Sequence, residues 1–160
     1  IIRRTRDYLK HTTPNLIIMG WSTWEREEWQ YNNKYYNVNS SGHDGLPDQL
    51  QSKYKKWVTA QTQEELIKKS KHWHTKIFEF HQELGAIPHV FFNCMYDFLN
   101  PSYEYPWGKC FIGPYDNDQS YYHWLKAQGC EADEWYHYKE DGHRLWASKI
   151  INYIKSNHII

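Results

Sequence analysis

The sequence is short of cysteine and of net charge, and both absences exclude whole classes of protein. Its three cysteines, Cys94, Cys110 and Cys130, are widely spaced and form no Cys-x-x-Cys pair. This pattern argues against a disulfide framework and against a structural zinc site, and it predicts a reducing, cytoplasmic location. Lys and Arg together number 19 and so do Asp and Glu, so the basic surface that attracts nucleic acids or anionic membranes is not expected.

Long apolar segments are missing as well. No run approaches the roughly 18 apolar residues that a membrane-spanning helix needs, and the basic start Ile-Ile-Arg-Arg-Thr-Arg lacks the apolar region of a secretory signal. We therefore expect no membrane span. Aliphatic side chains are few, and nine Trp, 14 Tyr and six Phe supply the apolar area instead. Because buried Trp and Tyr keep a polar tip, a core built from them needs hydrogen-bond partners.

The order of the apolar segments predicts an α/β domain. Residues 15–21 and 87–96 are short apolar runs, typical of parallel strands buried on both faces, and residues 109–112 predict a third strand. Helices are predicted at residues 1–11, 48–58, 62–85, 119–128 and 142–156. The longest begins at Thr62 as N-cap, ends at Gly85 and leads directly into the second strand, as a crossover connection does. Residues 22–48 show no periodicity and are predicted as a long loop.

A doubly wound sheet normally opens with a strand at its centre, whereas here a helix comes first. A length of 160 residues favours one domain over two. We therefore expect a single α/β domain over residues 1–160, with helices on both faces of a parallel sheet that lacks its first strand.

The segment 133–147 has the most informative spacing in the chain. Gly142 lies five residues after His137, His143 follows it directly, and Ala147 comes four residues later. This segment resembles the last conserved block of the SGNH, or GDSL-like, hydrolase superfamily, in which a catalytic His in an Asp-x-x-His turn precedes a Gly-His-x-x-x-Ala helix start. The resemblance implies that His137 is a general base, since a serine hydroxyl becomes a good nucleophile only when an imidazole takes its proton.

A carboxylate beside that imidazole fixes its tautomer, and the sequence offers two candidates. The family has Asp three residues before its His, whereas this chain has Glu134 there and Asp133 one residue earlier. Either carboxylate is a candidate for orienting His137. A second register makes His143 the base, with Glu140 three residues before it.

Residues 14–26 carry a second resemblance. The run Pro-Asn-Leu-Ile-Ile-Met-Gly-Trp-Ser-Thr-Trp-Glu-Arg is similar to the superfamily's strand and loop Pro-Asp-Leu-Val-Ile-Ile-x-x-Gly-x-Asn-Asp. Ser22 stands where the family has the Asn that helps to form the oxyanion hole, and Thr23 stands where it has the Asp. Ser22 is therefore a candidate oxyanion donor, and losing one such donor costs about 2.7–4 kcal/mol in the transition state. This variant is similar to uncharacterised, often phage-borne, members of the superfamily.

The superfamily's nucleophile motif, Gly-Asp-Ser, does not occur in the sequence, and neither does the Gly-x-Ser-x-Gly elbow of other serine hydrolases. The resemblance implies a three-layer, flavodoxin-like α/β fold over nearly all of this chain, truncated at its N-terminus. It implies hydrolysis of an ester or acetyl group through an acyl-serine intermediate, with a preceding segment supplying the serine and with no cofactor. The alternative is a descendant that has lost catalysis.

Trp and Tyr gather in residues 21–36 and 103–107, beside Asn and Asp side chains. Such platforms suit sugar rings, so the expected substrate is a small-molecule or glycan ester, and the alternative is a catalytically silent carbohydrate-binding or virion-associated protein. No metal site is expected on the long helix, because His72 and His74 point about 200° apart around it. His74, Phe78 and His81 are expected on one half-exposed face.

Overall fold

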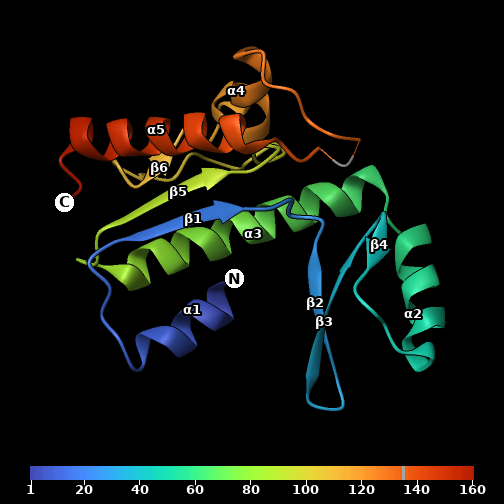
Figure 1. The fold of residues 1–160 in the computed structure, drawn as a ribbon. Coiled ribbons are helices and arrows are strands. Elements are labelled where there is room, and N and C mark those ends of the chain that lie inside the picture. The colour runs from blue at the N-terminus through green and yellow to red at the C-terminus, as the bar shows by residue number, and fades with distance from the viewer. Residues whose placement is uncertain (135) are drawn as a thin grey trace.

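Two three-stranded sheets, one parallel and one antiparallel, organise the chain (Figure 1). The computed structural model describes residues 1–134 and 136–160. The parallel sheet has the order β1 (Ile17–Trp21), β5 (His89–Asn93) and β6 (Phe111–Ile112). The antiparallel sheet has the order β2 (Glu27–Tyr31), β3 (Lys34–Asn39) and β4 (Gly42–His43). The helices are α1 (Ile2–Leu9), α2 (Asp48–Thr59), α3 (Gln63–Leu84), α4 (Tyr121–Ala127) and α5 (Glu140–Asn157), with a 3₁₀ turn at Asn117–Gln119.

The prediction of an α/β fold with a parallel sheet is confirmed, because β5 pairs in parallel with both β1 and β6. Helix α3 runs along one face of this sheet and α5 along the other (Figure 1). The predicted caps of α3 are also present: the Thr62 hydroxyl accepts a hydrogen bond from the Glu65 backbone N–H, and Gly85 follows the last turn with φ of +55°. Within the described residues, no helix combines the length and the apolar character that crossing a membrane requires.

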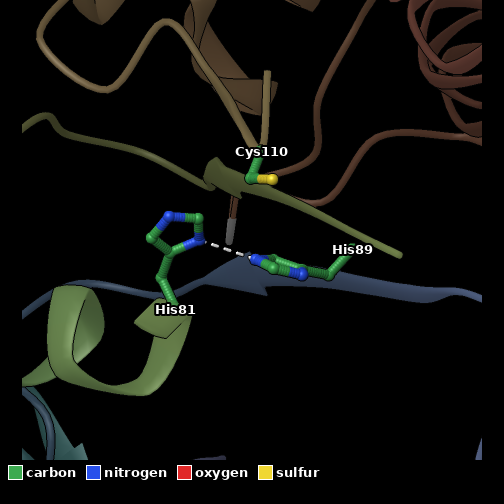
Figure 2. A group of neighbouring side chains, drawn as sticks. All are labelled: His81, His89 and Cys110. Carbon is green, nitrogen blue, oxygen red and sulfur yellow. Dashed lines mark hydrogen bonds between the residues drawn. The ribbon is translucent and has the colours of Figure 1, made fainter. Parts of the chain in front are cut away.

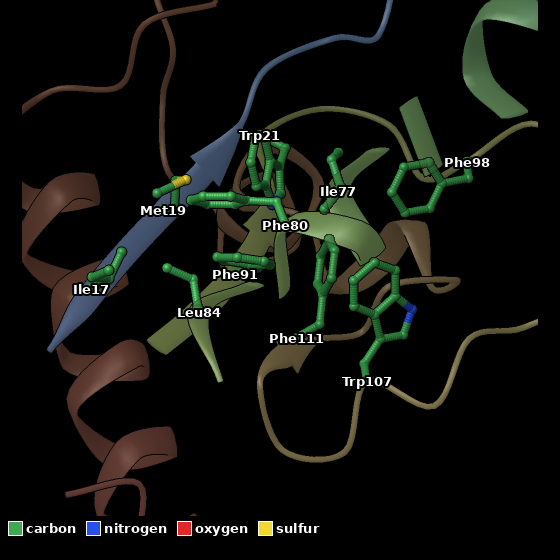
Figure 3. Packing of buried hydrophobic residues seen from close by; sticks show 10 residues of the cluster. All are labelled: Ile17, Met19, Trp21, Ile77, Phe80, Leu84, Phe91, Phe98, Trp107 and Phe111. Carbon is green, nitrogen blue, oxygen red and sulfur yellow. The ribbon is translucent and has the colours of Figure 1, made fainter. Parts of the chain in front are cut away.

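The core between α3 and the parallel sheet is mainly aromatic (Figure 3). Trp21 meets Phe91 edge-on with ring centroids 5.1 Å apart, and Trp107 meets Phe111 edge-on at 4.9 Å. Each such pair contributes about 0.5–1.5 kcal/mol beyond the area that it buries. Aromatic rings therefore replace the aliphatic side chains that the sequence lacks. The buried members of this cluster are Ile17, Met19, Trp21, Ile77, Phe80, Leu84, Phe91, Phe98, Trp107 and Phe111.

The prediction that the first strand is buried on both faces is wrong. Ile17, Met19 and Trp21 point into the core, but Ile18 on the other face is 49% exposed. The residues that α5 buries against the sheet lie on β5 and β6, including Val90. Strand β1 is therefore an edge strand with one covered face, because α5 lies over the strands beside it.

The prediction of a loop at residues 22–48 is also wrong, because residues 27–43 form the antiparallel sheet with its turns. Strands β2 and β3 are joined by a two-residue turn in which Asn32 and Asn33 have φ of 47° and 59°. Asn tolerates this left-handed conformation, which two-residue hairpin turns require. Trp29 and Val38 of the hairpin form a separate buried cluster with Leu46, and side chains of α2 pack against it. Aromatic residues of this region thus form a small core of their own.

Candidate functional site

A cavity of about 410 Å³ opens at the carboxyl ends of β1 and β5. Trp21 and Ser22 line it from the end of β1, and Asn93 lines it from the end of β5. Further lining comes from α1, β2 and α3 and from the segment after β5. Ligands of open α/β sheets bind at the carboxyl ends of the strands, so this cavity is the candidate functional site.

Polar groups lie at the carboxyl ends of both strands beside the cavity. Asn93 is only 4% exposed and donates from Nδ2 to the carbonyl of Pro114 at 3.3 Å. The indole N–H of Trp21 is buried and has no hydrogen-bond partner among the described residues. Leaving a buried donor unpaired costs about 1–3 kcal/mol, and the packing around this N–H closes it off from the cavity. Ser22 adds a hydroxyl to the same wall.

Arg3, Glu27 and Glu28 are charged groups of the cavity lining that have partners. Arg3 binds Glu28 with two hydrogen bonds of 3.0 and 2.9 Å. Burial alone would raise the pKa of Glu27, but hydrogen bonds from Lys69 and two indole N–H groups leave that pKa below its usual value. The Arg3 guanidinium lowers the pKa of Glu28. Both carboxylates are therefore ionised at neutral pH and cannot act as proton donors there.

The predicted base lies on the connection between α4 and α5. Figure 1 shows this connection beyond the ends toward which the β1 and β5 arrows point. The His137 backbone N–H donates to Asp133 Oδ1 at 2.8 Å, and His137 Nδ1 lies 3.5 Å from Asp133 Oδ2. An isolated bridge between Ala132 and Tyr138 closes the turn. The turn thus brings Asp133 to the imidazole, whereas Glu134 is exposed; Trp135 lies outside the described residues.

The Gly in the predicted helix start has a packing role in this structure. A Cβ added to Gly142 would lie 2.9 Å from Cβ of Tyr138. Tyr138 is buried, and its hydroxyl donates to the carbonyl of Tyr122 at 2.8 Å. Gly142 therefore lets the first turn of α5 pack closely against the residue that follows His137.

In the second register His143 is the base and Glu140 is its carboxylate. The structure gives these two side chains other partners. His143 Nδ1 lies 3.1 Å from the hydroxyl of Tyr121. Glu140 instead forms an ion pair with Arg144 one turn further along α5. Of the two predicted histidines, His137 is the one with a carboxylate at its ring.

The predicted residues occupy two places at the same end of the sheet. Ser22 lines the cavity, whereas His137 and Asp133 do not belong to its lining as far as the chain is described. The side chain of His137 is 78% exposed. A substrate bound to both groups would therefore extend from the cavity toward the connection between α4 and α5.

Of the face expected to be half-exposed, Phe78 and His81 are half-buried as predicted, whereas the prediction for His74 is wrong. His74 is only 3% exposed, because the rings of Phe98, Tyr105, Trp107 and Tyr115 surround it. His81 pairs with His89, and both lie near Cys110, so that one ligand atom from each is within 4.8 Å of the others. These three residues come from separate elements, and no local spacing in the sequence indicates them.

The described residues thus offer a polar and aromatic cavity, a carboxylate–imidazole pair at the same end of the sheet and a separate cluster of nitrogen and sulfur ligands. The function has to be inferred from this geometry, because no protein-family model, no curated protein and no solved structure matches this chain.

Proposed function

We propose that this chain is the larger part of an SGNH-type hydrolase domain that cleaves ester or acetyl groups through an acyl-serine intermediate. The observation that carries the proposal is the Asp133–His137 pair, which lies on the turn before the last helix. This turn lies at the end of the parallel sheet where the cavity opens (Figure 1). An imidazole next to a carboxylate at that edge is the arrangement that activates a serine hydroxyl.

In the proposed reaction His137 is the general base. Asp133 at Nδ1 favours the tautomer in which Nε2 carries the lone pair, and it stabilises the imidazolium that forms when Nε2 takes the serine proton. The Ser22 hydroxyl is the donor proposed for the developing oxyanion. A donor that is already held in place contributes more than bulk water does, because no solvent has to reorganise.

The strand order supports a flavodoxin-like version of the α/β fold. In the flavodoxin-like order 2-1-3-4-5 the last three strands follow one another across the sheet in chain order. Strands β1, β5 and β6 do the same. Further strands would then pair with the free edge of β1. A nucleophile at the carboxyl end of the adjoining strand would lie next to Ser22.

The experiment is to read the coding DNA immediately upstream of Ile1 and to express the longer chain. We expect an in-frame strand that ends in Gly-Asp-Ser and a protein that hydrolyses acetyl esters. His137→Ala is then expected to lower kcat roughly a thousandfold or more without loss of fold. His143→Ala is the matched control and should retain most of the activity. Unchanged turnover in His137→Ala, or an upstream strand without a serine, would refute the proposal.

The cavity lining favours one alternative, a carbohydrate-binding or virion-associated protein that does not catalyse a reaction. Trp24, Trp73 and Tyr96 line the cavity together with Ser22 and Asn93, a mixture of rings and hydrogen-bonding groups that suits a sugar. A saturable change in tryptophan fluorescence with acetylated and free sugars, without release of acetate by the longer chain, would select this alternative.

A further inference from the structure

The amino ends of β5 and β6 meet the last turn of α3 at His81, His89 and Cys110 (Figure 2). One ligand atom of each residue lies within 4.8 Å of the other two. His89 is the first residue of β5, and Cys110 directly precedes β6. The backbone N–H of Phe91 donates to the carbonyl of Cys110 at 2.7 Å, so sheet pairing holds the cysteine beside His89. The cluster thus lies at the opposite end of the sheet from the cavity that Ser22 lines.

Hydrogen bonds set the tautomers of both imidazoles. His89 Nδ1 is 2.7 Å from the carbonyl of Ile87, which can only accept, so Nδ1 carries the proton and Nε2 carries the lone pair. His81 Nδ1 is 2.7 Å from that Nε2 and donates to it. A carbonyl that accepts from the second nitrogen of an imidazole is the usual support of a metal-binding histidine. His89 is also only 2% exposed, so its ring is held in this orientation.

The charge states suit a divalent cation. Burial lowers the pKa of His81, with a smaller effect of His89, and burial also lowers the pKa of His89, so both rings are neutral at pH 7. Burial raises the pKa of Cys110, so its thiol is protonated when no cation is present. A dication would supply the positive charge that a thiolate at this position needs.

We propose that His81, His89 and Cys110 form a three-ligand site for a zinc-type transition-metal ion. Two imidazoles and one thiolate are ligands that Zn²⁺ binds well in tetrahedral geometry. Metal–ligand distances of about 2.0–2.3 Å place tetrahedral ligand atoms roughly 3.3–3.8 Å apart. The His81–His89 contact of 2.7 Å therefore has to open slightly, and the sulfur has to approach, when an ion binds.

The fourth position of this metal site would be open. A cavity of about 250 Å³ is lined by His89 and Cys110 together with Lys109 and His158. Three protein ligands with an open position are typical of zinc sites that bind water or a small anion, whereas structural sites have four protein ligands. The positive charge of Lys109 beside the cavity favours an anionic fourth ligand. This site is independent of the proposed hydrolase chemistry.

Metal binding has a defined proton balance. The ion replaces the thiol proton of Cys110, which leaves as H⁺. The Nδ1 proton of His81 moves to Nε2 of the same ring through solvent, so that Nδ1 can bind. Because both imidazoles are already neutral, one proton is released for each ion bound at pH 7.

The test is a titration of the metal-free chain with Co²⁺, a spectroscopic substitute for Zn²⁺. We expect one ion per chain, a thiolate-to-cobalt charge-transfer band, visible bands of a four-coordinate ion, and loss of both bands when Zn²⁺ is added. Cys110→Ser should remove the charge-transfer band and weaken binding roughly tenfold or more, since even supporting residues contribute that much. Cys130→Ser is the matched control for the thiol. His81→Ala should weaken binding and His72→Ala, an exposed position on the same helix, should not.

A second measurement uses the unaltered protein and does not depend on how the variants fold. Alkylation by iodoacetamide is monitored by peptide mass spectrometry. Zn²⁺ should slow the alkylation of Cys110 and should leave the alkylation rate of Cys130 unchanged. A Co²⁺ spectrum without a thiolate band, a band that persists in folded Cys110→Ser, or equal alkylation of Cys110 with and without Zn²⁺ would each overturn the proposal.

Discussion

Gly113→Ala is expected to lower the free energy of unfolding by roughly 2–5 kcal/mol. Gly113 follows β6 with φ of +48°, and a left-handed conformation costs a residue with a Cβ about 1–2 kcal/mol. An added Cβ would also overlap Cβ of Gln119 and lie 2.7 Å from its Cγ. Overpacking of this kind costs about 1–3 kcal/mol more.

The clash cannot be relieved by a change of rotamer, because Cβ of Gln119 is fixed by its backbone. Gln119 ends the 3₁₀ turn, and its side chain accepts a hydrogen bond from Lys149 at 2.9 Å. The carbonyl of Gly113 accepts from the Asp116 N–H in the same turn. The next carbonyl, that of Pro114, accepts from Asn93. A shift of this turn is therefore expected to disturb the cavity as well.

Gly108→Ala is the matched control for this prediction. Gly108 has φ of +58°, but an added Cβ would meet nothing within 4 Å. Its expected cost is the conformational one alone, about 1–2 kcal/mol. Urea unfolding of both variants, followed by tryptophan fluorescence, measures the difference. Equal losses of stability in the two variants would contradict the steric explanation.

The parts of the fold that depend on local interactions could be predicted from the sequence. Helix α3 begins and ends where Thr62 and Gly85 predict, because an N-cap hydroxyl and a glycine with positive φ act on neighbouring backbone groups. The hairpin at residues 27–39 was not predictable by the same means. Its turn is Asn-Asn rather than the more usual Asn-Gly, and which strand residues are buried depends on α2, which lies further along the chain.

Burial that depends on elements far away in the chain also could not be predicted from the sequence. The apolar run of β1 predicts two covered faces, but α5 buries residues of β5 and β6 and leaves Ile18 half-exposed. On α3 the sequence predicts His74 on a half-exposed face. The structure buries His74, and hydrogen bonding by Tyr115 satisfies its polar ring.

Only those residues of the candidate site that are close together in the chain could be predicted from the sequence. The spacing of residues 133–147 indicates His137, but it leaves Asp133 and Glu134 equivalent. The turn decides between them, because hydrogen bonds between Asp133 and His137 hold that carboxylate at the ring. The meeting of His89 with Cys110 depends on the pairing of β5 with β6, and local spacing carries no information about such long-range contacts.

The buried His74 is expected to make stability depend strongly on pH. Its Nε2 lies 2.9 Å from the Tyr115 hydroxyl, whose oxygen already accepts from the Tyr105 N–H at 2.6 Å and the Trp107 indole N–H at 2.9 Å. The tyrosine proton is therefore donated to His74, which must carry a lone pair at Nε2. Protonation of His74 would break this arrangement.

Burial lowers the pKa of His74 to about 4, whereas an unfolded histidine titrates near 6.5. Between these values the unfolded chain binds more protons than the folded one, so the free energy of unfolding falls as the pH falls. The stabilisation is complete above pH 6.5 and is lost progressively toward pH 4. The difference between the two pKa values corresponds to a loss of about 3 kcal/mol.

His74→Gln tests this account, because its amide carbonyl accepts the Tyr115 hydrogen bond and does not titrate. Urea unfolding at a series of pH values from 7 to 4.5 should show a flatter decline for this variant than for the unaltered chain. Some decline should remain, since burial also lowers the pKa values of His81 and His89. His72→Gln, at an exposed position two residues away, should retain the full slope. If His74→Gln and the unaltered chain declined in parallel, the protonation of His74 would not be what destabilises the fold in acid.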